Sequence, residues 1–202
     1  MKNIANQIEQ AVKKKRRGNF VFASDFAIFG SDEAVKKALQ RLQKSGFLMR
    51  VAHGIYYYPK INNYKFIENK YLSPTVKDIA YAIAKRDKAR IVPTGLYALN
   101  ALGLTTQVPM NVVFLTDGAP RRIAVGKGRG ILFKHTSELK KLTYKSELLM
   151  LIVSALREIG EGNATPQELK IIKSHLANVS QKEFDADIKL MTQWVRKTLL
   201  SL

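Results

Sequence analysis

The side chains best suited to bind a partner in this 202-residue chain are cations on one side of a predicted helix. Between Ser31 and Lys44, the residues at helical spacing on the other side are apolar: Val35, Ala38, Leu39 and Leu42. The remaining side carries four cations and an amide: Lys36, Lys37, Gln40, Arg41 and Lys44. Cations neutralise nucleic-acid phosphates, and glutamine hydrogen-bonds to base edges. We interpret this side as a DNA-binding surface; the alternative is the solvated polar back of an ordinary amphipathic helix.

A short hairpin follows this helix. Strands are predicted at Leu48–Val51 and Ile55–Tyr58, with Ala52-His53-Gly54 turning between them. In a DNA complex, Arg50 and His53 of this hairpin would reach the backbone beside the groove that the helix enters.

A shorter helix is predicted before the cationic one. It covers Asp25 to Ile28 with Ser24 as its cap, and Gly30 separates it from Ser31, which caps the longer helix. The order of short helix, turn, longer helix and hairpin is that of a winged helix-turn-helix. Its longer helix fits a major groove about 12 Å wide.

The net charge agrees with a polyanionic partner. The chain has 34 basic and 16 acidic residues, for a net charge of +18. Residues 1–60 carry +8 and residues 61–150 carry +9, whereas residues 151–202 carry only +1. A surface charged merely for solubility is the alternative, but repulsion of this size destabilises a compact fold. No segment has the basic and aromatic faces of a membrane-surface helix.

The run "KKKRRG" ends a first predicted helix, from Asn3 to Lys15. Its five cations meet the negative end of the helix dipole, and Gly18 stops the helix. The pattern fits a solvated helix end and a phosphate contact equally well. By composition alone it also fits a nuclear-import signal.

The chain after residue 60 predicts a mixed second domain. "KINNYKFIENKYL" is interpreted as the joint, and "SPTVKDIAYAIAKRD" as a helix with a serine cap and proline at its first position. A short helix closed by Gly103 follows. Three strands and two turns then predict a small antiparallel sheet: Val112–Thr116, Arg122–Val125 and Ile131–Lys134, separated by "DGAP" and "GKGRG".

The C-terminal part is predicted to be helical. Tyr144–Ile159 is apolar enough to be a buried helix, and two capping boxes open two final helices, Thr165 with Glu168 and Ser180 with Glu183. The second of these carries Trp194 late in its run. The prediction is an α+β fold with a winged helix-turn-helix domain at 1–60 and a C-terminal domain at 61–202.

No pattern in the sequence indicates catalysis, a metal or a cofactor. "GKGRG" lacks the Lys-Ser or Lys-Thr of a phosphate-binding loop and no helix follows it, so we interpret it as a basic hairpin turn. His53, His135 and His175 lie far apart, and there is no cysteine. No membrane span or secretory signal is recognisable, which predicts a cytoplasmic protein. An enzyme acting on nucleic acid or nucleotides stays the least favoured alternative.

Three segments resemble the AbiEi family of antitoxins from bacterial type IV toxin–antitoxin systems. They are the winged helix ending in "GIYYYP", the segment "PTGLYALNALGLTTQVP" and the segment "VVFLTDGAPRRIAVGKGRGILFKH". The resemblance covers about residues 1 to 160. The second and third segments are more specific than the helix-turn-helix, which many regulators share.

The resemblance implies two functions. The N-terminal domain would bind double-stranded operator DNA, typically at inverted repeats, through Lys36, Lys37, Gln40, Arg41, Lys44, Arg50 and His53. The C-terminal domain would counteract a nucleotidyltransferase-type toxin without requiring a stable complex. Charge alone selects a toxin-neutralising or second polyanion patch: Arg121, Arg122, Lys127 and Arg129. The alternative is a general nucleic-acid-binding transcriptional regulator without a toxin partner.

Overall fold

The computed structural model describes residues 3–62, 71–126, 128–138, 141 and 143–202. The chain forms two compact units, one of residues 1–83 with 123–128 and one of residues 84–122 with 129–202. The first unit therefore extends past residue 60, where the sequence predicts a boundary. The predicted α+β class is confirmed.

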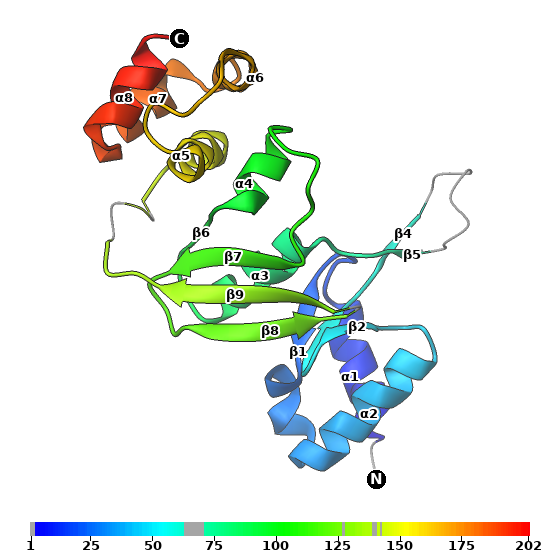
Figure 1. Ribbon diagram of the computed structural model, residues 1–202. Helices are drawn as coiled ribbons and strands as arrows, with labels where there is room; N and C mark the ends of the chain where they lie inside the picture. The colour runs from blue at the N-terminus through cyan, green and yellow to red at the C-terminus, as the bar shows by residue number, and fades with distance from the viewer. Residues whose placement is uncertain (1–2, 63–70, 127, 139–140, 142) are drawn as a thin grey trace. The chain divides into compact units, whose positions relative to one another are not determined.

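The first unit has the element order of a winged helix. Two helices, α1 (Ile4–Lys13) and α2 (Asp32–Lys44), flank a strand and a 3₁₀ helix, β1 (Phe20–Phe22) and η1 (Ala23–Phe29). Two further strands, β2 (Met49–Ala52) and β3 (Ile55–Tyr57), close an antiparallel sheet of order β1-β3-β2. Figure 1 shows α1 and α2 in contact beside this sheet.

Two helix-forming signals define α2. The Ser31 hydroxyl accepts a hydrogen bond from the Ala34 backbone N–H at 3.4 Å, which caps the first turn. Gly46, at φ +74°, follows the C-cap residue Ser45. The four apolar residues predicted to face the core are all buried: Val35, Ala38, Leu39 and Leu42. They pack with Ile8 and Val12 of α1, so one core orients both helices.

The short helix η1 differs from its prediction. It is a 3₁₀ helix from Ala23 to Phe29, and Ser24 is not its cap. The Asp25 carboxylate accepts a hydrogen bond from the Phe22 backbone N–H at 3.1 Å instead. A carboxylate reaches back three residues more easily than the shorter serine side chain, and the helix starts two residues earlier than predicted.

The chain after β3 forms a two-stranded ladder, β4 (Lys60–Ile61) with β5 (Tyr71–Leu72), and then helix α3 (Val76–Arg86). The predicted joint lies partly outside the described residues. The serine cap predicted for α3 is wrong. The Thr75 hydroxyl accepts from the Asp78 backbone N–H at 3.1 Å, and the Asp78 carboxylate accepts from the Thr75 backbone N–H at 2.9 Å.

A four-stranded sheet of order β6-β7-β9-β8 follows, and all of it except residues 123–125 of β8 belongs to the second unit. The strands are β6 (Ile91–Pro93), β7 (Asn111–Thr116), β8 (Arg121–Val125) and β9 (Arg129–His135). The predicted antiparallel sheet is mixed, because β7 and β9 pair in parallel, from Asn111 opposite Gly130 to Thr116 opposite His135. The tight turns suggested neighbouring hairpins, but β9 lies between β7 and β8, which gives it the same direction as β7.

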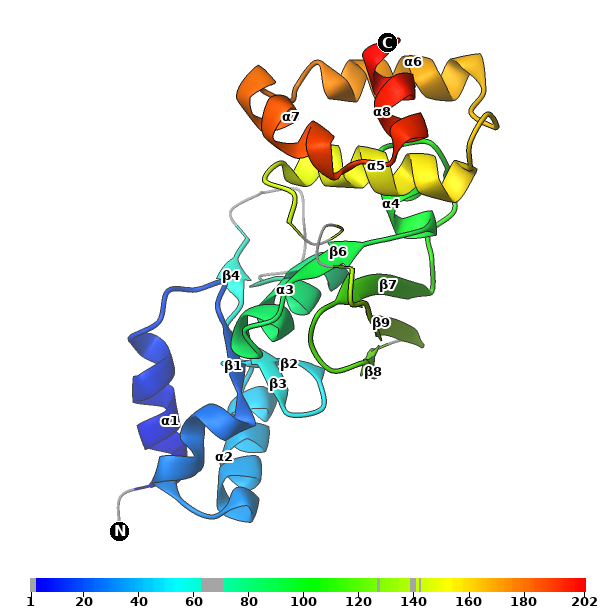
Figure 2. The same cartoon turned by 90° about the vertical axis from the view of Figure 1, so that its left-hand side faces the viewer.

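Helices complete the second unit: α4 (Leu96–Ala101), α5 (Glu147–Ile159), α6 (Pro166–Leu176), α7 (Gln181–Asp187) and α8 (Gln193–Leu200). Figure 2 shows α6, α7 and α8 on one side of α5. The predicted buried helix is correct, with Leu149, Ile152 and Leu156 at most 1% exposed. Both capping boxes lie at helix starts, where Thr165 and Ser180 accept backbone N–H groups from Glu168 and Glu183.

The last predicted helix is interrupted. It ends at Asp187, and a 3₁₀ turn, η3 (Ile188–Leu190), separates α7 from α8. The Asp187 carboxylate is 1% exposed and accepts backbone hydrogen bonds from Lys145 and Ser146 at 2.9–3.0 Å. Because this carboxylate caps the start of α5, the chain must turn at residue 187, and Trp194 lies early in α8.

Candidate nucleic-acid interface

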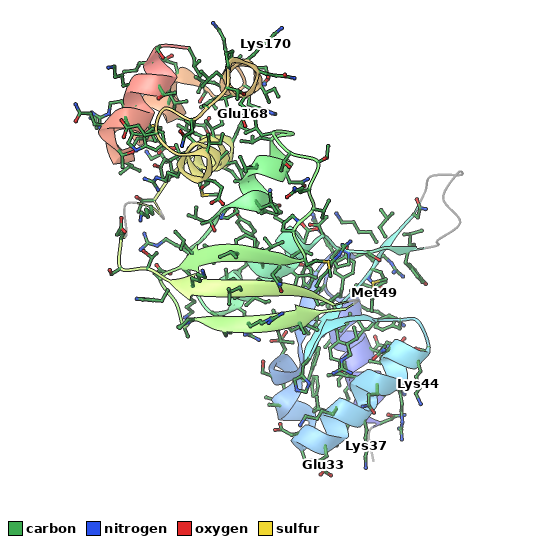
Figure 3. All side chains as sticks on the ribbon, in the orientation of Figure 1. Glu33, Lys37, Lys44, Met49, Glu168 and Lys170 are labelled. Atoms are coloured by element: carbon green, nitrogen blue, oxygen red, sulfur yellow. The ribbon has the colours of Figure 1, made fainter. Side chains whose placement is uncertain are left out.

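The cationic face of α2 comprises Lys36, Lys37, Gln40, Arg41 and Lys44. All five side chains are exposed. Within the described part of the chain, none of the four cations forms an ion pair with a carboxylate. Figure 3 shows Lys37 and Lys44 extending outward from α2. The charges are therefore available to a partner.

The packing of α2 explains this exposure. The buried residues occupy one side of the helix, and the steps of 100° per residue place the cationic face within an arc of about 140° opposite them. The two carboxylates of the first turn, Asp32 and Glu33, lie at the positive end of the helix dipole. They stabilise the helix start and leave the following three turns cationic.

The hairpin places the two other predicted DNA-binding side chains together. Arg50 and His53 are both exposed, and the Arg50 Nη2 atom lies 3.5 Å from His53 Nδ1. The hairpin turn is short, with Gly54 at φ +68°. Its tip is anchored, because the Gly54 carbonyl accepts from the Ala23 backbone N–H at 2.9 Å. The structure thus places Arg50 within strand β2 and His53 in the turn of the same hairpin.

The basic run after α1 divides into anchored and free cations. Lys13 pairs with Glu9 at 2.6 Å, and Lys15 lies 3.5 Å from Asp25. The Arg17 guanidinium donates to the Pro59 carbonyl at 2.9 Å and lies 4.5 Å from the centre of the Tyr58 ring. Two exposed cations of this run, Lys14 and Arg16, have no side-chain partner among the described residues.

The patch selected by charge in the second unit has a different character. The half-buried Arg121 pairs with Asp87, and its guanidinium lies 5.6 Å from the centre of the Phe133 ring. Arg122 donates to the Asn111 side-chain oxygen at 3.1 Å, and Arg129 is exposed. Lys127 lies outside the described residues. The structure thus leaves Arg122 and Arg129 exposed and holds Arg121 within the unit.

Two aspartates neutralise the arginines around this patch. Asp87 also pairs with Arg86 at 2.8 Å, and Asp117 accepts from both the backbone N–H and the Nε of Arg90 at 2.8 Å. The hydrogen bonds from Arg90 lower the pKa of Asp117. Burial, with a smaller contribution from the neighbouring Arg86, lowers the pKa of Arg121. In this arginine–aspartate cluster, Arg86, Asp87, Arg90, Asp117 and Arg121, each arginine is paired with an aspartate, and the sum of the five charges is +1.

The remaining histidines have structural hydrogen bonds. His135 Nδ1 lies 3.1 Å from the Gly118 carbonyl, and His175 Nε2 lies 2.9 Å from the Leu102 carbonyl. Over the described ranges, no group of three or more histidine or carboxylate side chains is placed to hold a metal ion. In the same ranges, no helix has the length and apolarity needed to cross a bilayer.

A family model matches residues 7–184, which covers both units. The chain belongs to DUF6088, a family of unknown function. The DUF6088 match includes the whole cationic face of α2, the hairpin and the arginine–aspartate cluster. No curated protein matches the chain.

The structure of this DUF6088 chain distinguishes cations that look alike in the sequence. Lys14 and Arg16 stand in a run of five cations. The other three contact Glu9, Asp25 and Pro59, and only these contacts separate the anchored cations from the free ones. Asp87 lies 34 residues from Arg121, so no local spacing reveals their pairing.

Proposed function

We propose that this chain binds double-stranded DNA through its first unit and acts as a transcriptional repressor of the antitoxin type. The observation that carries the proposal is the cationic face of α2, exposed and without carboxylate partners among the described residues. Its helix is rigidly held by one buried core, so the cations keep a fixed spacing. The hairpin adds the Arg50 guanidinium and the His53 ring.

The mechanism is electrostatic positioning followed by base reading. Lys36, Lys37, Arg41 and Lys44 displace counterions from DNA phosphates, which provides affinity without sequence preference. Gln40, in the middle of the same face, hydrogen-bonds to a base edge in the major groove and provides preference. The exposed Lys14 and Arg16 supply further phosphate contacts in this account.

The resemblance to AbiEi antitoxins supports the finer part of the proposal. In that account, the chain represses its own operon in the bacterial cytoplasm, and the second unit counteracts a nucleotidyltransferase-type toxin. Arg122 and Arg129 are the exposed cations of the patch assigned to that unit. A general nucleic-acid-binding regulator without a toxin partner is the competing function.

The salt dependence of DNA binding tests the first part. If about six phosphates are neutralised, affinity for a promoter fragment of its own operon falls about 10³-fold between 50 and 200 mM salt. Fluorescence anisotropy with this fragment, a random duplex and a structured RNA measures both affinity and preference. Preference for the promoter fragment is expected, and an affinity that does not change with salt contradicts the proposal.

Co-expression tests the second part. The neighbouring gene is placed under an inducible promoter, and growth is followed with and without this chain. Rescue of a growth defect caused by a nucleotidyltransferase-type neighbour supports the antitoxin function. Preference for the promoter without any rescue favours the regulator that has no toxin partner.

A further inference from the structure

The outer face of α1 differs in chemistry from the cationic face of α2. It carries a row of amide side chains, Asn3, Asn6, Gln7 and Gln10, with Ala11 beside them. The Glu9–Lys13 ion pair, at 2.6 Å, borders this row and is neutral as a pair. Lys14 follows the row at the end of the helix and, of the described residues, is the one unpaired charge on this face.

A hollow of about 490 Å³ lies along this face. Its lining consists of the amide row, Ala11, Lys14 and Phe29, which is the last residue of η1. The Phe29 ring stacks on the buried Phe26 ring at 6.2 Å between centres, so the hollow has a fixed apolar wall. Ile28, next to Phe29, is 85% exposed, the highest value among the large apolar side chains described.

The net charge of the chain limits which partner fits this amide-rich face. Two copies of a chain with net charge +18 repel each other wherever cationic surfaces meet. An amide-rich face avoids this repulsion, and because each amide both donates and accepts hydrogen bonds, the face is complementary to itself. A strongly acidic or basic partner would find no opposite charge in the row.

We propose that two copies of this chain associate through the outer face of α1, with Phe29 of each copy beside the contact. Such an interface is isologous, since the same patch is used twice across a two-fold axis. An axis perpendicular to α1 brings the two Gln7 side chains together and places the two Lys14 side chains at opposite ends. Like charges are thereby kept apart.

This interface adjoins the cationic face of α2 only at one edge, where Asn3 and Phe29 share a second hollow with Lys37 and Arg41. The buried side of α1, with Ala5, Ile8 and Val12, is the side that packs on α2, and the amide row lies on the other side. A face of one ten-residue helix with a neighbouring turn makes a small interface, for which a micromolar dissociation constant is expected. Self-association is therefore separable from DNA binding.

Sedimentation velocity without DNA tests the proposal. At about 50 µM, the wild-type chain should sediment with twice its 22.8 kDa mass. Gln7→Arg places like charges at the axis and should raise the dissociation constant at least about tenfold. Gln167→Arg, on the exposed first turn of α6, adds the same charge elsewhere and should leave the dimer intact. Thermal unfolding verifies that both variants are folded.

Disulfide trapping gives a second readout, because the chain contains no cysteine. Under mild oxidation, Gln7→Cys should form a covalent dimer in high yield, and Gln167→Cys should not. A wild-type chain that is monomeric at 50 µM, a dimer that survives Gln7→Arg, or equal trapping at both positions overturns the proposal. DNA binding in the same samples is scored separately, so its failure does not decide this test.

Discussion

The cationic face of α2 and the arginine–aspartate cluster of the second unit have similar numbers of cations and opposite environments. On α2, four cations project into solvent, and the carboxylates of Asp32 and Glu33 lie in the first turn, at the positive end of the helix dipole. In the cluster, Asp87 and Asp117 each accept from arginines at hydrogen-bond distance, and Arg121 lies against Phe133. Partnered arginines hold a fold together, whereas unpartnered ones remain available to a polyanion.

This difference shows why net charge alone does not locate a binding surface. Residues 61–150 carry slightly more positive charge than residues 1–60, yet three of their arginines form ion pairs with two aspartates of the same unit. Substitutions on the α2 face should therefore change DNA binding, and substitutions in the cluster should change the stability of the fold.

The largest effect is expected from charge reversal on α2. Lys37→Glu combined with Arg41→Glu replaces two phosphate contacts with repulsion and should weaken DNA binding by about 100-fold. Lys170→Glu with Lys173→Glu, on the exposed side of α6, makes the same charge change and should weaken it far less. Anisotropy at low salt measures both. Equal losses in the two variants would mean that the whole molecular charge, and not α2, binds DNA.

Removing a partnered arginine should affect stability instead. Arg121→Ala leaves Asp87 with one partner fewer and removes the contact with Phe133, which should lower the free energy of unfolding by about 2 kcal/mol. Arg129→Ala, at an exposed cation, should change it by less than about 0.5 kcal/mol. Urea unfolding measures both. If Arg121→Ala weakens DNA binding without changing the free energy of unfolding, the stabilising role assigned to this arginine is wrong.

A smaller effect should separate two residues within the α2 face. Lys44→Ala should weaken binding to all sequences and reduce the slope of log affinity against log salt by about one unit. Gln40→Ala should leave the slope unchanged and reduce preference for the operator by about 1–3 kcal/mol. Salt titrations on operator and random duplexes measure both. Identical behaviour of the two variants would rule out a reading role for Gln40.

The smallest effect concerns pH. Because hydrogen bonds from Arg90 lower the pKa of Asp117, the native state favours its carboxylate form. The resulting stability is fully present above the ordinary aspartate pKa of about 4 and is lost as pH falls through the lowered native value. Asp117→Asn should therefore be less stable than wild type at pH 6, with the difference shrinking below pH 4.

Arg90→Ala is the matched variant for this pH test. It removes the side-chain donor and keeps the backbone N–H of residue 90, so it should flatten the acid dependence only in part. Thermal unfolding across the acid range gives the measurement. A constant stability difference between wild type and Asp117→Asn from pH 6 to the most acidic sample would contradict the assigned cause.

The local part of the fold could be predicted from the sequence. The helical spacing of Val35, Ala38, Leu39 and Leu42 gave the buried side of α2, and with it the cationic face. Caps were predicted correctly where one hydroxyl precedes the helix, as at Ser31. They were wrong where an aspartate three residues beyond the cap decides the start: Asp25 bonds to Phe22 in place of a Ser24 cap, and Asp78 bonds to Thr75 in place of a Ser73 cap.

Pairings distant in sequence could not be predicted. Strand β9 pairs with β7 on one edge and with β8 on the other. Turn residues show where the chain bends, but they do not show which strand will lie beside which. Strand β6 is only three residues long and carries Pro93, so it gave no alternating pattern. The break at Asp187 arises from a contact with Lys145 and Ser146 about forty residues away.

Asp187 has a consequence for how this chain can be shortened. The family match ends at residue 184, yet the side chains of Met191, Val195 and Leu199 are at most 5% exposed and share a core with α5. A fragment cut at the family limit loses those three side chains together with the carboxylate that caps α5. Such a fragment would expose the apolar surface of α5 to solvent, so any expressed form should include the last eighteen residues.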